Sequence, residues 1–160
     1  RILFLSLDTG YERTIQEQAD WIKQELEVGY ELSFTQYHHP LYSAWNKGEK
    51  GITADEGRNH WVPIFDKYNL TMSFENHVHG FKRTKRIKNN TEDETGTVYL
   101  GDGSWGPIVH SWKPFNTDLI EKSDLVHHVW IIEIDDTNKI KATAFNENNE
   151  EIDSFIHEAN

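Results

Sequence analysis

The feature that most constrains the fold is an alternation of short apolar runs with amphipathic segments between residues 2 and 74. The apolar runs have the length of β-strands and occupy residues 2–7, 31–37 and 70–74. The segments between them repeat apolar side chains at helical spacing, over residues 14–27 and 58–68. This strand–helix–strand–helix–strand order predicts a layered α/β fold. Because the first run is almost continuously apolar, we expect its strand to be covered on both faces.

Local signals refine this outline. Thr14 and Glu17 form the S/T-x-x-E pattern of a helix N-terminus. Pro63 falls early in the second helix, where its missing N–H is tolerated. The stretch 44–57 is rich in Gly, Lys and Glu, and predicts a surface loop with Trp45 as its apolar anchor.

The second half of the chain is mainly β-type sequence. A strand at residues 97–100 stops at a glycine-rich turn. Three further runs, joined by short polar turns, lie at residues 127–135, 139–146 and 151–156. Short polar turns between such runs predict an antiparallel β meander. With no internal repeat or linker, we expect one unit, residues 1–160, with a βαβαβ part at 1–106 and mainly antiparallel strands at 107–160.

Histidines stand where two of the predicted strands end. His38 follows the second strand, where Pro40 stops further pairing, and His77 and His79 follow the third. Neighbouring parallel strands deliver their carboxyl ends to one edge of a sheet, so the three side chains are expected to converge. If the backbone after the third strand is extended, His77 and His79 point to the same side. Imidazole is a common ligand of zinc and iron, so these three are candidate metal ligands. Before any family resemblance is considered, a structural or incidental role for the His77 and His79 pair is the favoured alternative.

The remaining histidines and two nearby acids are expected to have other roles. Packed or solvated side chains, rather than ligands, are expected at His39, His60, His110, His127, His128 and His157. Glu75 and Asp102 lie close to the predicted site and are expected to be surface charges. The basic run at residues 82–88 fits a solvated loop or a Lys-protected edge strand as well as a phosphate-facing surface, and these interpretations stay open.

The composition excludes several classes of function. Lys and Arg number 16 against 27 Asp and Glu, a net charge of −11, so the surface as a whole should repel nucleic acid and anionic membranes. With no Cys, any metal site must use His, Asp, Glu, Asn or Tyr. No apolar run approaches the roughly 18 residues of a membrane span. The chain begins on a strand without Met, from which we expect a fragment that lacks its N-terminal part.

Several short motifs, taken in order, carry a family resemblance over the chain up to about Gly106. They are Asp8-Thr9, Gln18 with Asp20-Trp21-Ile22, Tyr37-His38-His39-Pro40-Leu41-Tyr42-Ser43, Trp61-Val62-Pro63-Ile64-Phe65-Asp66-Lys67-Tyr68, His77-Val78-His79-Gly80-Phe81-Lys82-Arg83-Thr84 and Gly96-Thr97-Val98-Tyr99. Together they resemble the C-terminal half of a calcineurin-like metallophosphoesterase, closest to the purple acid phosphatase branch. The resemblance implies the C-terminal portion of a layered α/β sandwich.

The resemblance also implies a binuclear metal centre that hydrolyses phosphate esters with a metal-activated hydroxide. His38 and His77 correspond to ligands of one ion and His79 to a ligand of the other, the metals being Fe, Zn or Mn. The other ligands of the family, which are aspartates, a tyrosine and an asparagine, lie N-terminal to the matched region and have no counterpart here. We therefore expect the chain alone to have negligible phosphatase activity and at most weak metal binding.

A second hypothesis stays open beside the enzyme. The glycine that precedes the histidine in two family motifs is replaced by Tyr37 and Asn76, and these bulkier side chains are expected to shift the strand tips. A degenerate, non-catalytic relative that serves as a binding or structural module fits the same replacements. The residues leave the substrate, the oligomeric state and the compartment open, and the resemblance alone favours a secreted or cell-envelope location.

Overall fold

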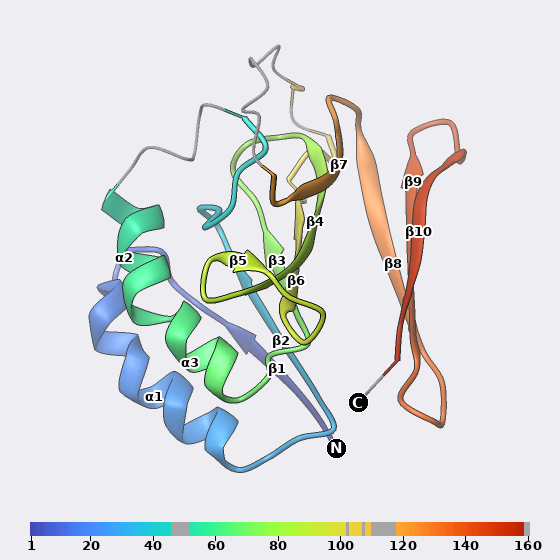
Figure 1. Ribbon diagram of the computed structural model, residues 1–160. Helices are drawn as coiled ribbons and strands as arrows, with labels where there is room; N and C mark the ends of the chain where they lie inside the picture. The colour runs from blue at the N-terminus through green and yellow to red at the C-terminus, as the bar shows by residue number, and fades with distance from the viewer. Residues whose placement is uncertain (46–51, 102, 107, 110–117, 159–160) are drawn as a thin grey trace.

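Three layers make up the computed structural model, which describes residues 1–45, 52–101, 103–106, 108–109 and 118–158 (Figure 1). Helices cover one face of a central sheet, and a smaller sheet stands against the other face. The helices are α1 (Ile15–Glu27), α2 (Ile52–His60) and α3 (Val62–Lys67). Within the described residues, no helix has both the length and the apolar character needed to cross a membrane.

The central sheet has seven strands in the order β1-β2-β3-β6-β4-β5, with β7 also paired to β4. Their bounds are β1 (Ile2–Ser6), β2 (Leu32–Tyr37), β3 (Met72–Glu75), β4 (Phe81–Lys88), β5 (Thr91–Glu92), β6 (Thr97–Gly101) and β7 (Ile120–Asp124). Strands β1, β2, β3 and β6 are mutually parallel, whereas β4 is antiparallel to β6. The carboxyl ends of four parallel strands therefore meet at one edge, as the alternation predicted.

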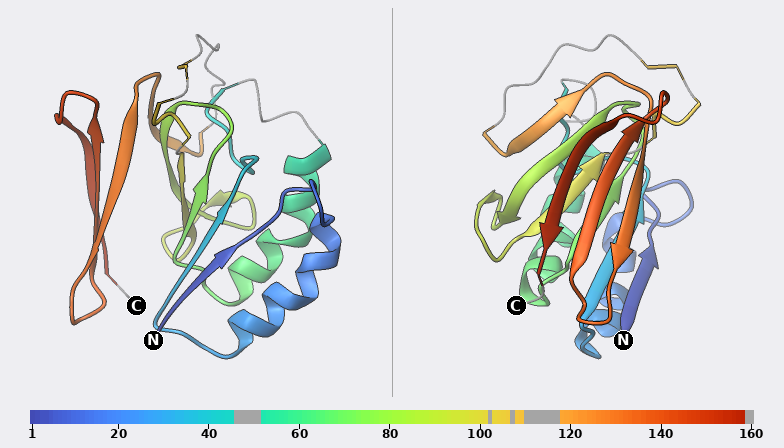
Figure 2. Two further views of the ribbon diagram at one scale, coloured as in Figure 1. Left: turned by 180° about the vertical axis from the view of Figure 1, so that it is seen from behind. Right: turned by 90° about the vertical axis from the view of Figure 1, so that its right-hand side faces the viewer.

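The smaller sheet confirms the predicted meander. It contains β8 (His128–Ile134), β9 (Ile140–Asn146) and β10 (Glu151–His157) in antiparallel order. Figure 2 shows this sheet from two further sides, standing along the central one. Trp130 of β8 and Ile140 of β9 share a core with Phe34 and Met72 of the central sheet. This apolar contact joins the two sheets.

The predicted first helix and its cap are confirmed. Thr14 Oγ1 accepts a hydrogen bond from Glu17 N at 3.2 Å, and Glu17 Oε2 accepts one from Thr14 N at 2.9 Å, which completes a capping box. The apolar stripe of α1 is buried at Ile15, Ile22 and Leu26. The helix thus lies flat on the sheet and fixes where β2 begins.

Strand β1 corrects the expectation of cover on both faces. It forms the edge of the central sheet, and Ile2 and Phe4 are 51% and 52% exposed. Leu3 and Leu5 face the helices and belong to the core. Among the described residues, the smaller sheet packs on Phe34 of β2 and Met72 of β3 but not on β1, so the second face of this edge strand stays open to solvent.

Two other expectations need correction between the second and third strands. Residues 52–57 are helical rather than loop, whereas Trp45 is buried as predicted and residues 46–51 lie outside the described part of the chain. The single helix predicted for residues 58–68 is divided into α2 and α3 at Trp61. Pro63 explains the division, because its nitrogen cannot donate to the carbonyl four residues earlier.

The basic run at residues 82–88 is neither a solvated loop nor an edge strand. It forms β4, which pairs with β6 on one side and with β5 and β7 on the other. Lys82 is 2% exposed, and Arg83 donates to Asp153 Oδ2 at 2.6 Å. Lys82 and Arg83, two of the five basic residues in this run, therefore form ion pairs inside the protein.

His157 gives the stability of the fold a defined pH dependence. Burial, with the Arg86 guanidinium beside the ring, lowers the pKa of His157 from 6.5 to about 4. Because the unfolded chain then binds the proton more readily, the contribution of His157 is fully present above pH 6.5 and is lost as the pH falls toward 4. Urea unfolding of the wild type and of His157→Asn should show the wild type losing stability relative to the variant across this window. A stability difference that stays constant from about pH 7 to about pH 4.5 would contradict the assignment.

Candidate metal centre

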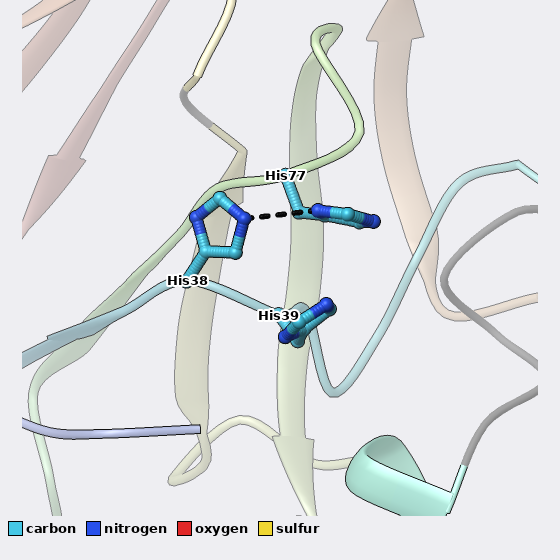
Figure 3. Close-up of side chains that lie close together, drawn as sticks. All are labelled: His38, His39 and His77. Atoms are coloured by element: carbon cyan, nitrogen blue, oxygen red, sulfur yellow. Dashed lines mark hydrogen bonds between the residues drawn. The ribbon is translucent and has the colours of Figure 1, made fainter. Parts of the chain in front are cut away.

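Three histidine rings gather where β2 and β3 end (Figure 3). His38 Nε2 and His77 Nδ1 lie 2.9 Å apart and share a hydrogen bond. The His39 ring centroid lies 4.3 Å from that of His77 and 5.0 Å from that of His38. One nitrogen from each of the three rings can be chosen so that all lie within 4.8 Å of one another. The structure thus brings together two of the predicted ligands and adds His39, which was expected to be merely packed or solvated.

His79 occupies a different place from the other two predicted ligands. Its Nδ1 lies 3.0 Å from the carbonyl oxygen of Ile108, and it is not part of the three-ring group. It is near enough for its charge to affect His38, whose pKa it helps to lower. Three histidines assigned to two ions need not form one group, so this placement leaves the predicted ligand set His38, His77 and His79 as a prediction.

The backbone around His77 is a tight turn and not the extended segment that the sequence predicted. His77 and His79 have φ values of 71° and 54°, both left-handed. Val78 N donates to Asn76 O at 2.9 Å across His77, which is the pattern of a γ-turn with positive φ. Such a conformation costs about 1–3 kcal/mol per residue and persists where surrounding contacts impose it. Val78 supplies one such contact, since it is buried against Trp45.

Close packing fixes this turn from two sides. A Cβ on Gly80 would lie 2.6 Å from the Trp45 ring, so the chain after His79 passes directly against the indole. Gly103, with a φ of 105°, approaches the other side, where a Cβ would lie 3.2 Å from His77 N. The position of His77 is therefore imposed by backbone-to-backbone contact as well as by its own strand.

Tyr37 and Asn76, which replace family glycines, connect the two strand tips. Asn76 N donates to His38 O at 3.1 Å, and the Asn76 amide donates to Tyr37 O at 2.8 Å. The Tyr37 ring turns into the core, where its hydroxyl donates to Glu75 Oε1 at 2.8 Å. These bonds hold the two histidine-bearing loops side by side.

Glu75 is not the surface charge that was expected. Its side chain is fully buried and forms an ion pair with Lys82, whose side chain is 3% exposed. The same carboxylate accepts from Leu41 N at 2.7 Å, in the loop that follows His39. A buried carboxylate persists only when it is paired and hydrogen-bonded, and here those partners come from β2, its following loop and β4. The sequence position offered no sign of this, because Lys82 appeared to be one of several surface bases. Asp102, the other acid expected at the surface, lies outside the described residues.

The loop after β1 forms the third side of the site. Both Asp8 carboxylate oxygens accept backbone N–H groups, from Gly10, Tyr11, Glu12 and Arg13 at 2.7 to 3.0 Å. The bond from Tyr11 is the largest of the effects that lower the pKa of Asp8, so the carboxylate stays ionised and the loop stays closed. The loop stacks the Tyr11 ring on His39, with centroids 5.7 Å apart, and lets Thr9 Oγ1 accept from His39 N at 3.2 Å.

Two histidines of the group, His38 and His39, are held in surroundings that favour the neutral ring. Partial burial lowers the pKa of His38, aided by the nearby His79, and partial burial also lowers the pKa of His39. A neutral imidazole has one nitrogen lone pair that can bind a metal ion. Sequence reasoning missed His39, Thr9 and Tyr11 as parts of the site. The adjacent His38-His39 pair pointed toward His39, and Asp8-Thr9 among the family motifs pointed toward Thr9.

No family model matches the chain. In sequence it is 30% identical over 107 residues to Purple acid phosphatase 18 of Arabidopsis thaliana, a match that covers 63% of this chain and 24% of that protein. In fold it is similar to the purple acid phosphatase PPD1 from yellow lupin (Lupinus luteus) seeds, with a TM-score of 0.84, 20% identity, and coverage of 96% of this chain and 30% of that one. It is also similar to GAP50, the anchor in the inner membrane complex of Plasmodium, with a TM-score of 0.75, 14% identity, and coverage of 98% and 48%.

These similarities confirm the expected fold class and the expected resemblance to the purple acid phosphatase branch. The mixed α/β sheet with helices and a three-stranded antiparallel sheet matches the fold of part of the lupin protein. The chain spans about a quarter of the length of the curated relative, since it covers 24% of it.

Proposed function

We propose that this chain, a relative of the purple acid phosphatases in sequence and fold, is the C-terminal portion of a two-metal phosphoesterase. The observation that carries the proposal is the hydrogen-bonded pair His38 and His77, whose nitrogens lie 2.9 Å apart at the carboxyl edge of the parallel sheet. Pockets and metal sites in open α/β sheets form at this edge. The strained turn at His77 supports a functional role, because left-handed residues cluster at active sites.

The donor set fits the metal ions that the family resemblance implies. His38 and His77 would hold one ion and His79 the other, while the carboxylate and amide ligands would come from residues N-terminal to this chain. When bound, such ions polarise a phosphate ester and activate water for its hydrolysis. Imidazole nitrogens suit iron, zinc and manganese to different degrees, and three histidines alone do not choose between them.

In the proposed centre, the residues of this chain fix the positions of the imidazoles and keep two of them neutral. Glu75 and Asn76 bind the two histidine-bearing loops to each other, so the imidazoles do not have to be ordered when a ligand arrives. Partial burial of His38 and His39 keeps their rings neutral near pH 7. The proposed substrate class is a phosphate ester. Nothing in the described residues indicates which alcohol forms the leaving group of that ester.

The proposal is tested by hydrolysis of an aryl phosphate. The complete gene product should turn the ester over in a metal-dependent way, whereas residues 1–160 alone should show negligible activity, because one half of the ligands is missing. His60→Ala, on α2 and away from the three rings, is the matched control and should leave activity unchanged. Turnover by residues 1–160 alone would refute the division of ligands, and an inactive complete product with its metals bound would refute the enzyme assignment.

A binding or structural module is the second candidate function. The similarity of fold to GAP50, the anchor in the inner membrane complex of Plasmodium, supports this alternative. The choice rests on the residues upstream of the chain. If the complete gene product lacks the aspartate and asparagine ligands there, the module is favoured and the enzyme assignment fails.

A further inference from the structure

We propose that His39 is a metal ligand, so that this chain by itself holds a single zinc-type ion through His38, His39 and His77. The family resemblance does not assign His39. The inference deepens the proposed function, since both use His38 and His77, but it can be tested without any phosphatase activity.

The first support is the convergence of the three rings. His38 Nε2 and His77 Nδ1 are already 2.9 Å apart, and a nitrogen of His39 lies within 4.8 Å of both. The hydrogen bond between the first two requires an N–H on one ring and a lone pair on the other, both directed to the same point. Both nitrogens can bind one metal ion once the ring that donates this bond carries its proton on its other nitrogen instead, which leaves each imidazole neutral with a lone pair on the binding atom. Small ring rotations then bring in His39.

The second support is the way His39 is held. Its Nδ1 lies 3.2 Å from Thr9 Oγ1, and Thr9 is 4% exposed. When the proton sits on Nδ1, the ring donates to Thr9 and Nε2 has the free lone pair. Metal-binding histidines typically have their other nitrogen fixed in this way by a hydroxyl, carbonyl or carboxylate neighbour. Tyr11 stacks on the same ring, with an interplanar angle of 20°, and limits its rotation.

The chemistry of the group selects the kind of ion. Among the described residues the group contains three imidazoles and no carboxylate. Neutral nitrogen donors favour Zn²⁺ and Co²⁺, whereas Mg²⁺ demands oxygen ligands. Three protein ligands leave a fourth position of a tetrahedral ion open. His38 is exposed, so an ion can enter from solvent.

His79 lies on the same turn as His77 but outside the group, so it does not belong to the ligand set proposed for this ion. Its Nδ1 faces the carbonyl oxygen of Ile108. If the ion is held as proposed, loss of the His79 imidazole leaves its three ligands in place. If the ligand set were limited to the residues of the family motifs, loss of His39 would be harmless.

The test is a titration of residues 1–160 with Co²⁺, followed by the visible absorption of the bound ion and by calorimetry. One equivalent should bind with the spectrum of a four-coordinate, nitrogen-ligated ion, and Zn²⁺ should displace it whereas Mg²⁺ should not. His39→Ala should weaken binding by at least about 100-fold, and Thr9→Val by about 10- to 100-fold, because Thr9 orients the ligand. His60→Ala, on α2 and outside the group, should change the affinity by less than about threefold, and circular dichroism should show every variant folded.

Two outcomes would overturn the inference. Affinity that survives His39→Ala would exclude His39 as a ligand while leaving the proposed two-metal centre intact. Absence of any stoichiometric Co²⁺ binding by the folded chain would also refute it. Failure of the proposed function has a separate signature, which is an inactive, metal-loaded complete gene product.

Discussion

Replacing Lys82 by alanine is expected to lower the free energy of unfolding by about 3–5 kcal/mol, measured by urea denaturation. The loss follows from burial, because the Glu75 side chain is fully enclosed and the Lys82 side chain is 3% exposed. Alanine would leave the carboxylate charged, or force it to take up a proton, in a site that water does not reach. The remaining partners, Tyr37 O–H and Leu41 N–H, donate hydrogen bonds but carry no compensating charge.

Two controls separate this effect from a general cost of removing a lysine. Lys85→Ala breaks an ion pair with Glu92 at the surface, where the acid is 62% exposed, and should have a far smaller effect. The double variant Glu75→Gln with Lys82→Met removes both charges, so it should be less destabilised than Lys82→Ala alone. Suppose that Lys82→Ala lowers the free energy of unfolding no more than Lys85→Ala does. The ion pair between Glu75 of β3 and Lys82 of β4 then does not stabilise the fold.

Replacing His77 by alanine should reduce the phosphatase turnover of the complete gene product by more than about 100-fold, the upper end of what loss of a mere supporting contact costs at a metal site. His77 is the central ring of the group, since it is bonded to His38 and lies closest to His39. If His77 is the ligand that we propose, its removal takes away a direct metal contact and also the partner that fixes His38. The folded state should survive, because the ring is only partly buried and the turn is held by Val78 and Gly80.

The control for this variant is His60→Ala, which should retain wild-type turnover. The circular dichroism spectrum and the urea midpoint of His77→Ala should remain close to those of the wild type. A fall in turnover can then be attributed to loss of the metal ion rather than to unfolding. Activity within about threefold of the wild type would show that His77 is not a ligand of a catalytic ion.

Much of the fold was predictable because its signals are local. The helical spacing of apolar residues and the Thr14–Glu17 capping box predicted the first helix. The short apolar runs predicted the strands. The positions of His38 and His77 at neighbouring strand tips followed from the topology alone. Parallel strands separated by helices leave few alternatives for where their ends meet.

The details of the site depend on contacts that are distant in sequence. Glu75 is buried because Lys82, seven residues later, returns on β4 to pair with it, and an isolated acid after a strand gives no sign of this. The left-handed turn at His77 is imposed by Trp45 and Gly103 from other loops, and local propensity argues against it. His39 enters the site because the Asp8 loop places Thr9 against it. Each of these features is a tertiary effect that overrides the local pattern.

The most direct test of the central claim is the metal content of the purified complete gene product, measured by elemental analysis. A two-metal phosphoesterase built on these strand tips should contain about two transition-metal ions per polypeptide, and His77→Ala should lose at least one of them. His60→Ala should contain as many as the wild type. A wild-type protein that folds but contains no stoichiometric metal, after growth and purification with iron, zinc and manganese present, would contradict the account.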